Sequence, residues 1–366
     1  MLCCSLHLTS RCFFERFRAL IAVLFGNLWL AAMCALSLLA VWCFWCGASS
    51  RLSFSAANLG VACRALKATP STPAVVSFAI LFSGGWGLLW ILALTGLAEL
   101  MSGVDLNDSG SVGIITTFLL LLSFFWGGNV ISNVGHVAVS GAVASWWFKH
   151  PSNFVLESSS VTSNALWRAC TSSFGSVCYG SLLVSLLEAA RSTLRSLRKL
   201  NRCVAFCVDC VLSVLEGWTM YINRYAFTYV AIYGDDFMTA GRRVNALFNH
   251  RGFWNTIVND VILSRILYFG ALGIALSSAA FGYAIGYLLL KHDDHASAIA
   301  LVGLLIGWLL ATATMGAVDS AVATVYVAFG EDPQALKDNH PDDFGTLYKG
   351  WNQNYPEVMA VLLVAA

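Results

Sequence analysis

Regularly spaced tyrosines, a glutamate and an arginine gather in a single apolar stretch of the chain. Tyr221, Tyr225 and Tyr229 recur every four residues, so on a helix they lie along one slowly drifting face. Glu216 and Arg224 belong to the same run. A charge within a membrane-spanning segment is costly, so it usually faces the protein interior and has a function there. Glu216 is therefore interpreted either as the partner of a bound cation or as the counter-ion of Arg224, although the spacing of eight residues places the two charges two turns apart.

A second polar set lies further upstream, within another apolar run. Asn129, Asn133, His136 and Ser140 follow one another at i, i+4, i+7 and i+11, which gives a helix one polar face. Such a face either forms hydrogen bonds between helices or lines the path of a substrate. Trp126 lies just above this face and would belong to the same path.

Other candidates for chemistry are weaker. The spacing Cys203-x3-Cys207-x2-Cys210 is that of a radical iron–sulfur motif, but it occurs in an apolar run without alternating strands and helices. We interpret these thiols as buried or lipidated and predict no cofactor and no metal site. No Ser/His/Asp arrangement occurs that would indicate a hydrolase. The pair Asp235-Asp236 is more typical of a solvated loop than of a catalytic site.

The composition indicates an integral membrane protein. Of the 366 residues, 58% are hydrophobic and only 11% are charged, whereas a soluble domain carries about 25% charged residues. The chain contains no basic arm, zinc-finger spacing or phosphate loop, so a nucleic-acid or nucleotide partner is not predicted. Most of the 12 cysteines lie within or beside apolar runs, which does not fit a disulfide framework.

About seven hydrophobic segments predict an all-α, multi-pass membrane bundle. We divide the chain into a short basic segment (1–18), a helical transmembrane domain (19–329) and a cytoplasmic C-terminal tail (330–366). The expected segments are Ala19–Cys46, Val75–Met101, Gly113–Phe148, Ala165–Leu187, Cys203–Gly234, Val261–Leu290 and Ala296–Phe329. Three polar stretches connect them: residues 51–67 and the Ser-rich run to Asn164 are interpreted as linkers, and 235–260 as a hydrophilic loop.

The third segment is about 54 Å long if it is fully helical. That length exceeds a bilayer, so we expect it to tilt or to break at Gly127-Gly128 or at Gly135. The repeats Gly282-x3-Gly286 and Gly303-x3-Gly307 are typical of closely packed helices.

Charge bias predicts the orientation of the loops. The basic loops 51–67 and 235–260 are assigned to the cytoplasm, and the acidic loop 102–112 to the outside, where Asn107 occupies a glycosylation sequon. The basic run 191–202 would then lie outside, against the rule, unless the fourth and fifth segments are shallow and re-entrant. The basic residues 1–18 would also lie outside, which a missing upstream span would explain.

Several ordered elements resemble the choline transporter-like family. Two of them lie in and directly after the stretch with the tyrosines: Tyr221-Ile-Asn-Arg-Tyr-Ala-Phe227 and Val230-Ala-Ile-Tyr-Gly-Asp-Asp-Phe237. The run His136–Phe148 is similar to the family's Ala-Gly-x-x-Ala-x-Trp-Tyr-Trp element, and Phe174–Ser181 to its Gly-Ser-x-x-x-Gly-Ser element. Arg51–Ala57 resembles the start of the family's middle inner loop, and Glu331–Pro333 the start of its tail.

The resemblance implies a carrier of ten spans with both ends cytoplasmic, and it implies that the fourth and fifth segments do span. Relative to the family's pattern, this chain lacks the first spans and a large extracellular loop, and it has Tyr225 where a second Asn is common. The implied substrate is choline or a related quaternary ammonium solute, which is bound by aromatic faces and a nearby carboxylate.

The expected site is a cage with Glu216 as counter-charge and with Asn133 and His136 on its wall; the aromatic members are Trp126, Tyr221, Tyr225 and Tyr229. The expected mechanism is alternating access in the plasma membrane, and the oligomeric state stays open. The alternatives are a membrane scaffold or non-functional truncated carrier and, less favoured, a lipid-modifying membrane enzyme using Asp235-Asp236 or His292/His295.

Overall fold

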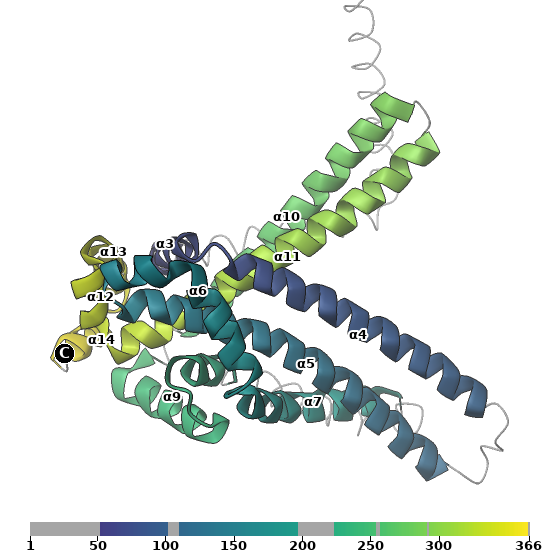
Figure 1. The fold of residues 1–366 in the computed structure, drawn as a ribbon, viewed down its shortest axis with the longest axis horizontal. Helices are drawn as coiled ribbons and strands as arrows, with labels where there is room; N and C mark the ends of the chain where they lie inside the picture. The colour runs from purple at the N-terminus through teal and green to yellow at the C-terminus, as the bar shows by residue number, and fades with distance from the viewer. Residues whose placement is uncertain (1–51, 102–109, 197–222, 254–256, 291–292, 365–366) are drawn as a thin grey trace, which may run out of the picture. The chain divides into compact units, whose positions relative to one another are not determined.

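The structure is a computed structural model that describes residues 52–101, 110–196, 223–253, 257–290 and 293–364. The predicted all-α class is confirmed, because these residues form helices joined by short turns and contain no strand (Figure 1). The helices are α3 (Leu52–Ala68), α4 (Thr72–Met101), α5 (Gly110–Phe148), α6 (Pro151–Cys170), α7 (Phe174–Ser196), a helix at 223–233, α9 (Phe237–Arg251), α10 (Ile257–Leu290), α11 (Asp293–Glu331), α12 (Pro333–Asn339), α13 (Pro341–Asn354) and α14 (Pro356–Val364). The described residues from Phe54 onward belong to one compact unit.

Four of the described helices are long and apolar enough to cross a membrane: α4, α5, α10 and α11. They correspond to the second, third, sixth and seventh predicted segments. The fourth segment is a bent pair, because α6 and α7 meet at an angle of 65° over a short break. Such a pair is either a broken span or a re-entrant loop, and counting it as one span gives five among the described residues. The first segment and residues 203–222 of the fifth lie outside the described residues.

Of the two expectations for the third segment, a tilt or a break, the structure excludes the break. Helix α5 runs without interruption for 39 residues, through Gly127, Gly128 and Gly135. Two of these glycines permit close packing instead. A Cβ atom at Gly127 would lie 2.5 Å from the Trp86 ring, and one at Gly135 would lie 3.4 Å from the Ala79 Cβ. The glycines therefore bring α4 against α5 rather than interrupting α5.

Three stretches predicted as linkers or loops are helices: α3, α6 and α9. Each of these stretches is more polar on average than the membrane-spanning helices, but its apolar residues recur at helical spacing, which is typical of an amphipathic helix. In α9 the buried side chains are Phe237, Ala240, Val244 and Phe248, a pattern of i, i+3, i+7 and i+11. Asp236 caps its N-terminus through the Thr239 N–H, and the hydrogen bonds from Thr239 hold the pKa of the Asp236 carboxyl below its usual range. Helix α6 begins with Pro151 at its first turn, a position that suits proline.

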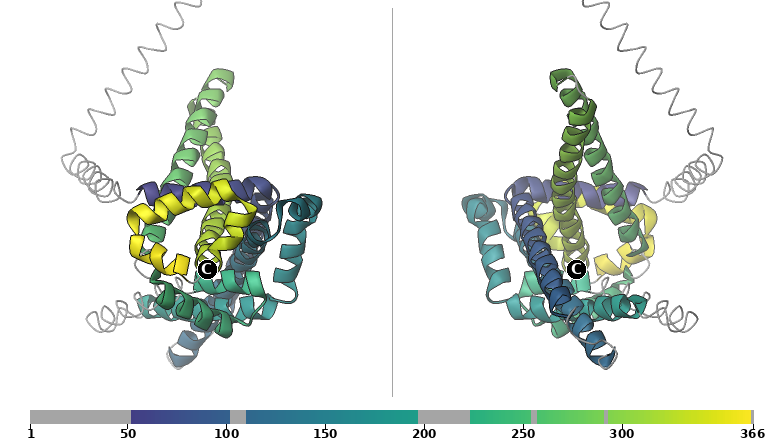
Figure 2. Two further views of the ribbon diagram at one scale, coloured as in Figure 1. Left: turned by 90° about the vertical axis from the view of Figure 1, so that its left-hand side faces the viewer. Right: turned by 90° about the vertical axis from the view of Figure 1, so that its right-hand side faces the viewer.

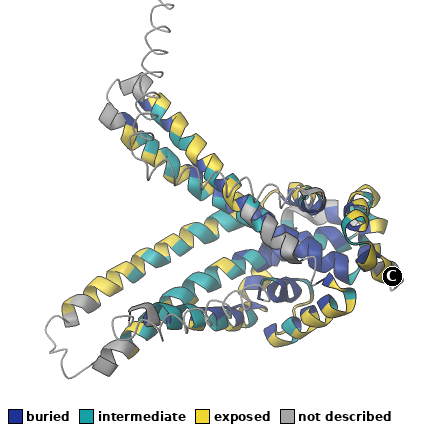
Figure 3. Ribbon diagram, turned by 180° about the vertical axis from the view of Figure 1, so that it is seen from behind, coloured by how far each residue is buried: buried dark blue, intermediate teal, exposed yellow. Residues whose placement is uncertain are grey.

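The predicted C-terminal tail is folded into the core. Helices α12, α13 and α14 lie beside α3 and α9 (Figure 2), and Leu336, Leu347 and Trp351 are fully buried. Figure 3 shows that buried residues concentrate at this end, around the last turns of α5 and α11, whereas α4 is largely exposed. The large exposed side chains of α4, such as those of Phe78 and Leu88, are apolar, as expected for a helix in contact with lipid.

Helices α10 and α11 pack against each other through the predicted glycine repeats. A Cβ atom at Gly282 would lie 2.9 Å from the Ile299 carbonyl oxygen, and one at Gly303 would lie 2.8 Å from that of Ser278. Such distances leave no room for any larger residue unless the helices move apart. The structural interpretation of these repeats is therefore confirmed.

Replacing Gly286 by Val is expected to destabilise this helix pair. The new Cβ atom would lie 2.8 Å from the Ala296 Cα atom, a backbone atom that cannot turn away. Overpacking of this kind costs about 1–3 kcal/mol, which would appear as a lower melting temperature of the purified protein in detergent. Gly273→Val is the matched control, because it places the same residue on the same helix with no heavy atom within 4 Å. Equal melting temperatures for the two variants would contradict the prediction.

Candidate functional site

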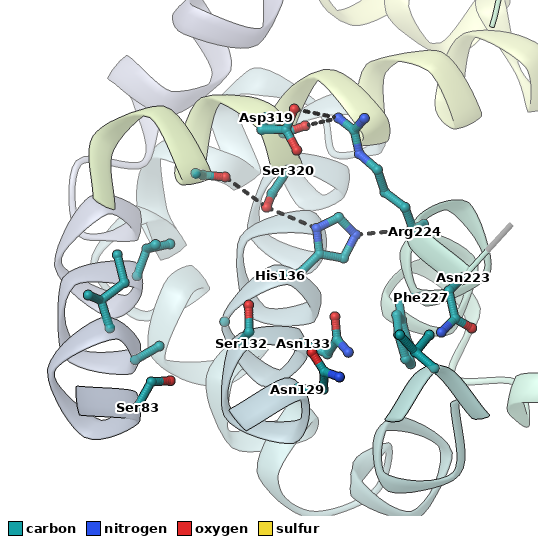
Figure 4. A pocket seen from close by; sticks show the side chains of 16 residues that line it. Ser83, Asn129, Ser132, Asn133, His136, Asn223, Arg224, Phe227, Asp319 and Ser320 are labelled. Atoms are coloured by element: carbon teal, nitrogen blue, oxygen red, sulfur yellow. Dashed lines mark hydrogen bonds and ion pairs between the residues drawn. The ribbon is translucent and has the colours of Figure 1, made fainter. Parts of the chain in front are cut away.

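A cavity of about 380 Å³ lies among the membrane-spanning helices. Its walls come from α4, α5, α7, the helix at 223–233 and α11 (Figure 4). The polar residues that line it are Ser83, Asn129, Ser132, Asn133, His136, Asn223, Arg224, Asp319 and Ser320. This volume falls within the range of small-molecule sites, about 300–1,000 Å³. Polar side chains are costly among apolar spans, so this concentration marks the cavity as the candidate site.

His136 connects three helices at the wall of the cavity. Its Nδ1 lies 2.9 Å from Ser320 Oγ on α11, and its Nε2 lies 3.0 Å from the Arg224 carbonyl oxygen. Because a carbonyl oxygen only accepts, Nε2 donates to Arg224. In the neutral imidazole, Nδ1 then accepts from the Ser320 hydroxyl. The histidine thereby positions the helix at 223–233 against α11 at the level of the cavity.

The charged groups of the cavity form an ion pair. Arg224 Nη2 lies 3.0 Å from Asp319 Oδ1 and donates to the Asp319 carbonyl oxygen at 2.7 Å. Ser264 donates to the same carboxylate at 2.8 Å. The Asp319 side chain is 34% exposed and that of Arg224 17%, so the carboxylate is the more accessible charge. Asp319 is thus a counter-ion of Arg224, whereas Glu216 lies outside the described residues.

The predicted polar face of α5 forms hydrogen bonds between helices and also lines the cavity, while its role in a substrate path stays a prediction. Asn129 Nδ2 donates to Glu188 Oε2 at 2.9 Å and to Ser185 Oγ at 3.0 Å, and Asn133 Nδ2 donates to Ser181 Oγ at 2.9 Å, all on α7. These are hydrogen bonds between helices. The same two asparagines also line the cavity together with His136. One face of α5 therefore binds its neighbour and forms the cavity wall.

The cavity lies within a stretch that is recognisable by sequence. A sequence model of the family described as plasma-membrane choline transporter matches residues 31–334. The chain belongs to this family. The match covers most of the chain and includes every helix that lines the cavity. It confirms the family resemblance and assigns the chain to a family of membrane transporters.

Individual relatives agree with the family match. The chain is 27% identical to a CTL-like protein of Dictyostelium discoideum over 334 residues, covering 90% of the chain and 57% of that protein. It is 29% identical to protein PNS1 of Gibberella zeae (69% of the chain, 47% of that protein). It is 27% identical to protein PNS1 of Saccharomyces cerevisiae (88% and 62%). The chain thus spans about half to two thirds of the length of these relatives.

Within this choline transporter family fold, the described aromatic residues of the predicted cage do not come together. Tyr225 is fully buried against Phe248, with ring centroids 5.0 Å apart. Tyr229 donates a hydrogen bond to Glu331, and Trp126 donates to the Cys178 carbonyl oxygen at 3.0 Å. None of these three residues lines the cavity. Their role in substrate binding stays a prediction. Glu216 and Tyr221 lie outside the described residues, so their role in binding also stays a prediction. The same holds for Asn107 as a glycosylated residue.

Sequence reasoning missed the aromatic residue that does line the cavity, Phe227. Asn223, Arg224 and Phe227 share one face of their helix, at i, i+1 and i+4, whereas Tyr225 and Tyr229 occupy another face. The signal was present in the polar pair Asn223-Arg224, because a buried charge indicates the face that points inward. The predicted cage instead used Tyr225 and Tyr229, which lie on the opposite face of this helix.

The acids proposed for a membrane enzyme have structural roles here. Asp235 pairs with Arg243, Nη1 to Oδ2 at 2.6 Å, and Asp236 caps α9. His292 lies outside the described residues, as do the side chain of His295 and the cysteines of the iron–sulfur spacing. In the part of the chain that the structure describes, no three His, Cys, Asp or Glu side chains are placed to hold a metal ion.

Proposed function

We propose that this chain moves choline or a related quaternary ammonium solute across a membrane by alternating access, with the cavity around His136, Arg224 and Asp319 as its binding site. The observation that carries the proposal is this polar cavity among apolar spans, in a chain of the choline transporter family. We further propose the plasma membrane as its location and Asn107 as a glycosylated residue, as the resemblance and the loop charges suggest.

The cavity offers the groups that such a solute requires. The Asp319 carboxylate would attract the ammonium charge, and the face of Phe227 would contact the methyl groups, because an aromatic face attracts a cation that cannot donate hydrogen bonds. The amides of Asn129 and Asn133 have oxygens that could accept from the solute hydroxyl. The fixed Arg224 charge would limit binding to solutes that also present an oxygen acceptor, as the hydroxyl of choline does.

The small residues that α4 contacts around the cavity are compatible with sliding of this helix in the transport cycle. Gly135 on α5 and Gly316 on α11 both face this helix, and Cβ atoms there would lie 3.4 Å from Ala79 and 3.5 Å from Val76. Contacts between small side chains present few obstacles to sliding, which is how packed helices shear during domain motions. In the proposed cycle, α4 moves against α5 and α11 and opens the cavity to each side in turn.

The direct test is uptake of labelled choline by proteoliposomes that contain the purified chain. Saturable uptake is expected, and excess unlabelled choline should compete. The neutral isostere 3,3-dimethylbutanol, which has the same shape without the charge, should compete at least about tenfold more weakly, since a desolvated charge contact contributes about 1.5 kcal/mol or more. No uptake by correctly inserted protein, or equal competition by the two compounds, would contradict the proposal.

Glu216 stays a candidate for the second negative charge of the site. Glu216→Gln is expected to abolish choline uptake while the protein still reaches the membrane, because the neutral amide cannot balance the ammonium charge. The measurement is uptake normalised to the amount of protein in the membrane, with Glu357→Gln on the C-terminal helix α14 as control. Unchanged uptake would remove Glu216 from the site and leave Asp319 as the counter-charge.

A further inference from the structure

A second space, distinct from the polar cavity, lies among α4, α5, α6 and the start of α7. It is a groove of about 670 Å³ with an almost entirely apolar lining. Its apolar wall includes Val75, Phe78, Phe82, Val130, Val134 and Leu166. Three hydroxyl groups also line it, those of Ser71, Thr162 and Ser163. It meets the polar cavity only at Ala79 and Gly135, which line both spaces.

The position of the groove determines what surrounds it. Two of its walls, α4 and α5, are membrane-spanning helices. Phe78 and Phe82 at its edge are 70% and 60% exposed, and their rings stack with centroids 6.4 Å apart. In a bilayer such side chains contact hydrocarbon. An apolar groove that opens beside them is therefore in contact with acyl chains rather than with water.

One buried hydroxyl in this groove indicates a more specific ligand. Thr162 is 3% exposed, and its Oγ1 makes no hydrogen bond among the described residues. Ser163, by contrast, donates to the Ser160 carbonyl oxygen at 2.9 Å. A buried hydroxyl without a partner is unfavourable, because it has lost its hydrogen bonds to water. A ligand that is mostly hydrocarbon but brings one oxygen acceptor would satisfy it.

We propose that the groove binds a membrane phospholipid, with one acyl chain along α4 and an ester carbonyl that accepts a hydrogen bond from Thr162. The stretch from Ser71, just before the start of α4, to Phe82 is about 17 Å long at the helical rise. That length is close to half of the roughly 30 Å hydrocarbon core, which is the depth that one acyl chain occupies in its leaflet. Ser71 immediately precedes α4, so its hydroxyl lies where the apolar span begins.

A lipid in this groove would contact the back of the polar cavity. Ala79 and Gly135 form the shared wall, and a Cβ atom at Gly135 would lie 3.4 Å from the Ala79 Cβ. Because these residues are small, an acyl chain on one side lies close to whatever occupies the other side. The bound lipid would thereby hold α4 against α5, and this inference stands whether or not the cavity binds choline.

The test uses a phosphatidylcholine that carries a diazirine on its acyl chain. The purified full chain is reconstituted with this lipid and then dissolved in detergent before illumination, so that only retained lipid reacts. Labelled peptides are identified by mass spectrometry. We expect label on the groove residues of α4 and α5, and much less on the α4 face around Leu92, which is 67% exposed but does not line the groove.

Four variants separate specific binding from general contact with lipid. Thr162→Val keeps the shape of the side chain and should lower groove labelling about fivefold, the effect of one hydrogen bond, whereas Thr162→Ser should retain it. Val134→Trp should fill the groove and exclude the lipid, and Leu92→Trp, outside the groove, should not. Melting temperatures of the variants identify any that fail to fold, and Thr162→Val with Thr162→Ser remains the deciding pair.

Several results would overturn the proposal. Equal labelling at the groove and around Leu92 would mean bulk contact only. Unchanged labelling of Thr162→Val would remove the hydrogen bond. Labelling by a sterol probe in place of the phospholipid would assign a different ligand. A crosslink from position 78 to residues 19–46, in place of lipid, would mean that the chain itself covers the groove.

Discussion

Replacing Asp319 by Asn is expected to lower choline uptake about thirtyfold. The amide keeps the shape of the side chain but removes the charge that faces Arg224 at 3.0 Å. Loss of one member of a buried, hydrogen-bonded charge pair costs about 2–5 kcal/mol, and the 34% exposure of Asp319 argues for the lower end, about 2 kcal/mol. The measurement is the initial rate of labelled choline uptake, normalised to the protein present in the proteoliposomes.

This single variant alters two properties at once, because Asp319 both faces the cavity and balances Arg224. A double variant separates them. Arg224→Leu combined with Asp319→Leu replaces the ion pair by apolar side chains, which is often neutral or stabilising for a buried pair. We therefore expect the double variant to melt at a higher temperature than Asp319→Asn, while its choline uptake stays as low as that of the single variant.

Recovery of choline uptake in the double variant would contradict a binding role for Asp319. If the double variant recovers uptake together with stability, the ion pair only supports the fold. Asp338→Asn on α12 serves as the control for loss of an acid, since Asp338 is exposed, lies outside the cavity and accepts only from Gln334. Its uptake should equal that of the unaltered protein.

Hydropathy predicted the apolar helices well and the amphipathic ones poorly. The boundaries of α4, α10 and α11 fall within a few residues of the predicted segments, because the bilayer requires long apolar runs. Helices α3 and α9 have too many polar residues for such a criterion. Their apolar residues recur with helical period, as Phe237, Val244 and Phe248 do, and it is this period that predicts a helix with one buried face.

The cavity was half predictable. The polar face of α5 follows from its spacing alone, and both Asn133 and His136 line the cavity. What spacing cannot give is the partner across the cavity. Arg224 and Asp319 are 95 residues apart in the chain, and only the packing of α11 against α5 and α4 brings them together. Glu216 lies only eight residues from Arg224, so local spacing predicts it as the partner of that arginine. Spacing along the chain gives no information on residues that the fold brings together.

Trp351→Ala is expected to have the largest effect on stability. Trp351 is fully buried, with its ring 5.0 Å from that of Phe54 and 4.9 Å from those of Phe253 and Phe329. Truncating a buried tryptophan costs about 3–5 kcal/mol. The variant also leaves the buried Asn58 Oδ1 without the N–H that it accepts from Trp351 at 3.2 Å. Thermal unfolding in detergent, followed by calorimetry, measures the loss.

Trp167→Ala is the matched control, because Trp167 is 71% exposed and its truncation should change stability by less than about 0.5 kcal/mol. Trp351→Phe should lie between the two, since it keeps most of the packing and loses the hydrogen bond to Asn58. If Trp351→Ala unfolds at the same temperature as Trp167→Ala, α13 is not part of the core. The C-terminal residues would then be the solvated tail that their polar composition predicts. If instead Trp351→Ala melts far below the control, α3, α11 and α13 fold as one unit, and the stability of the protein depends on residues that follow α11.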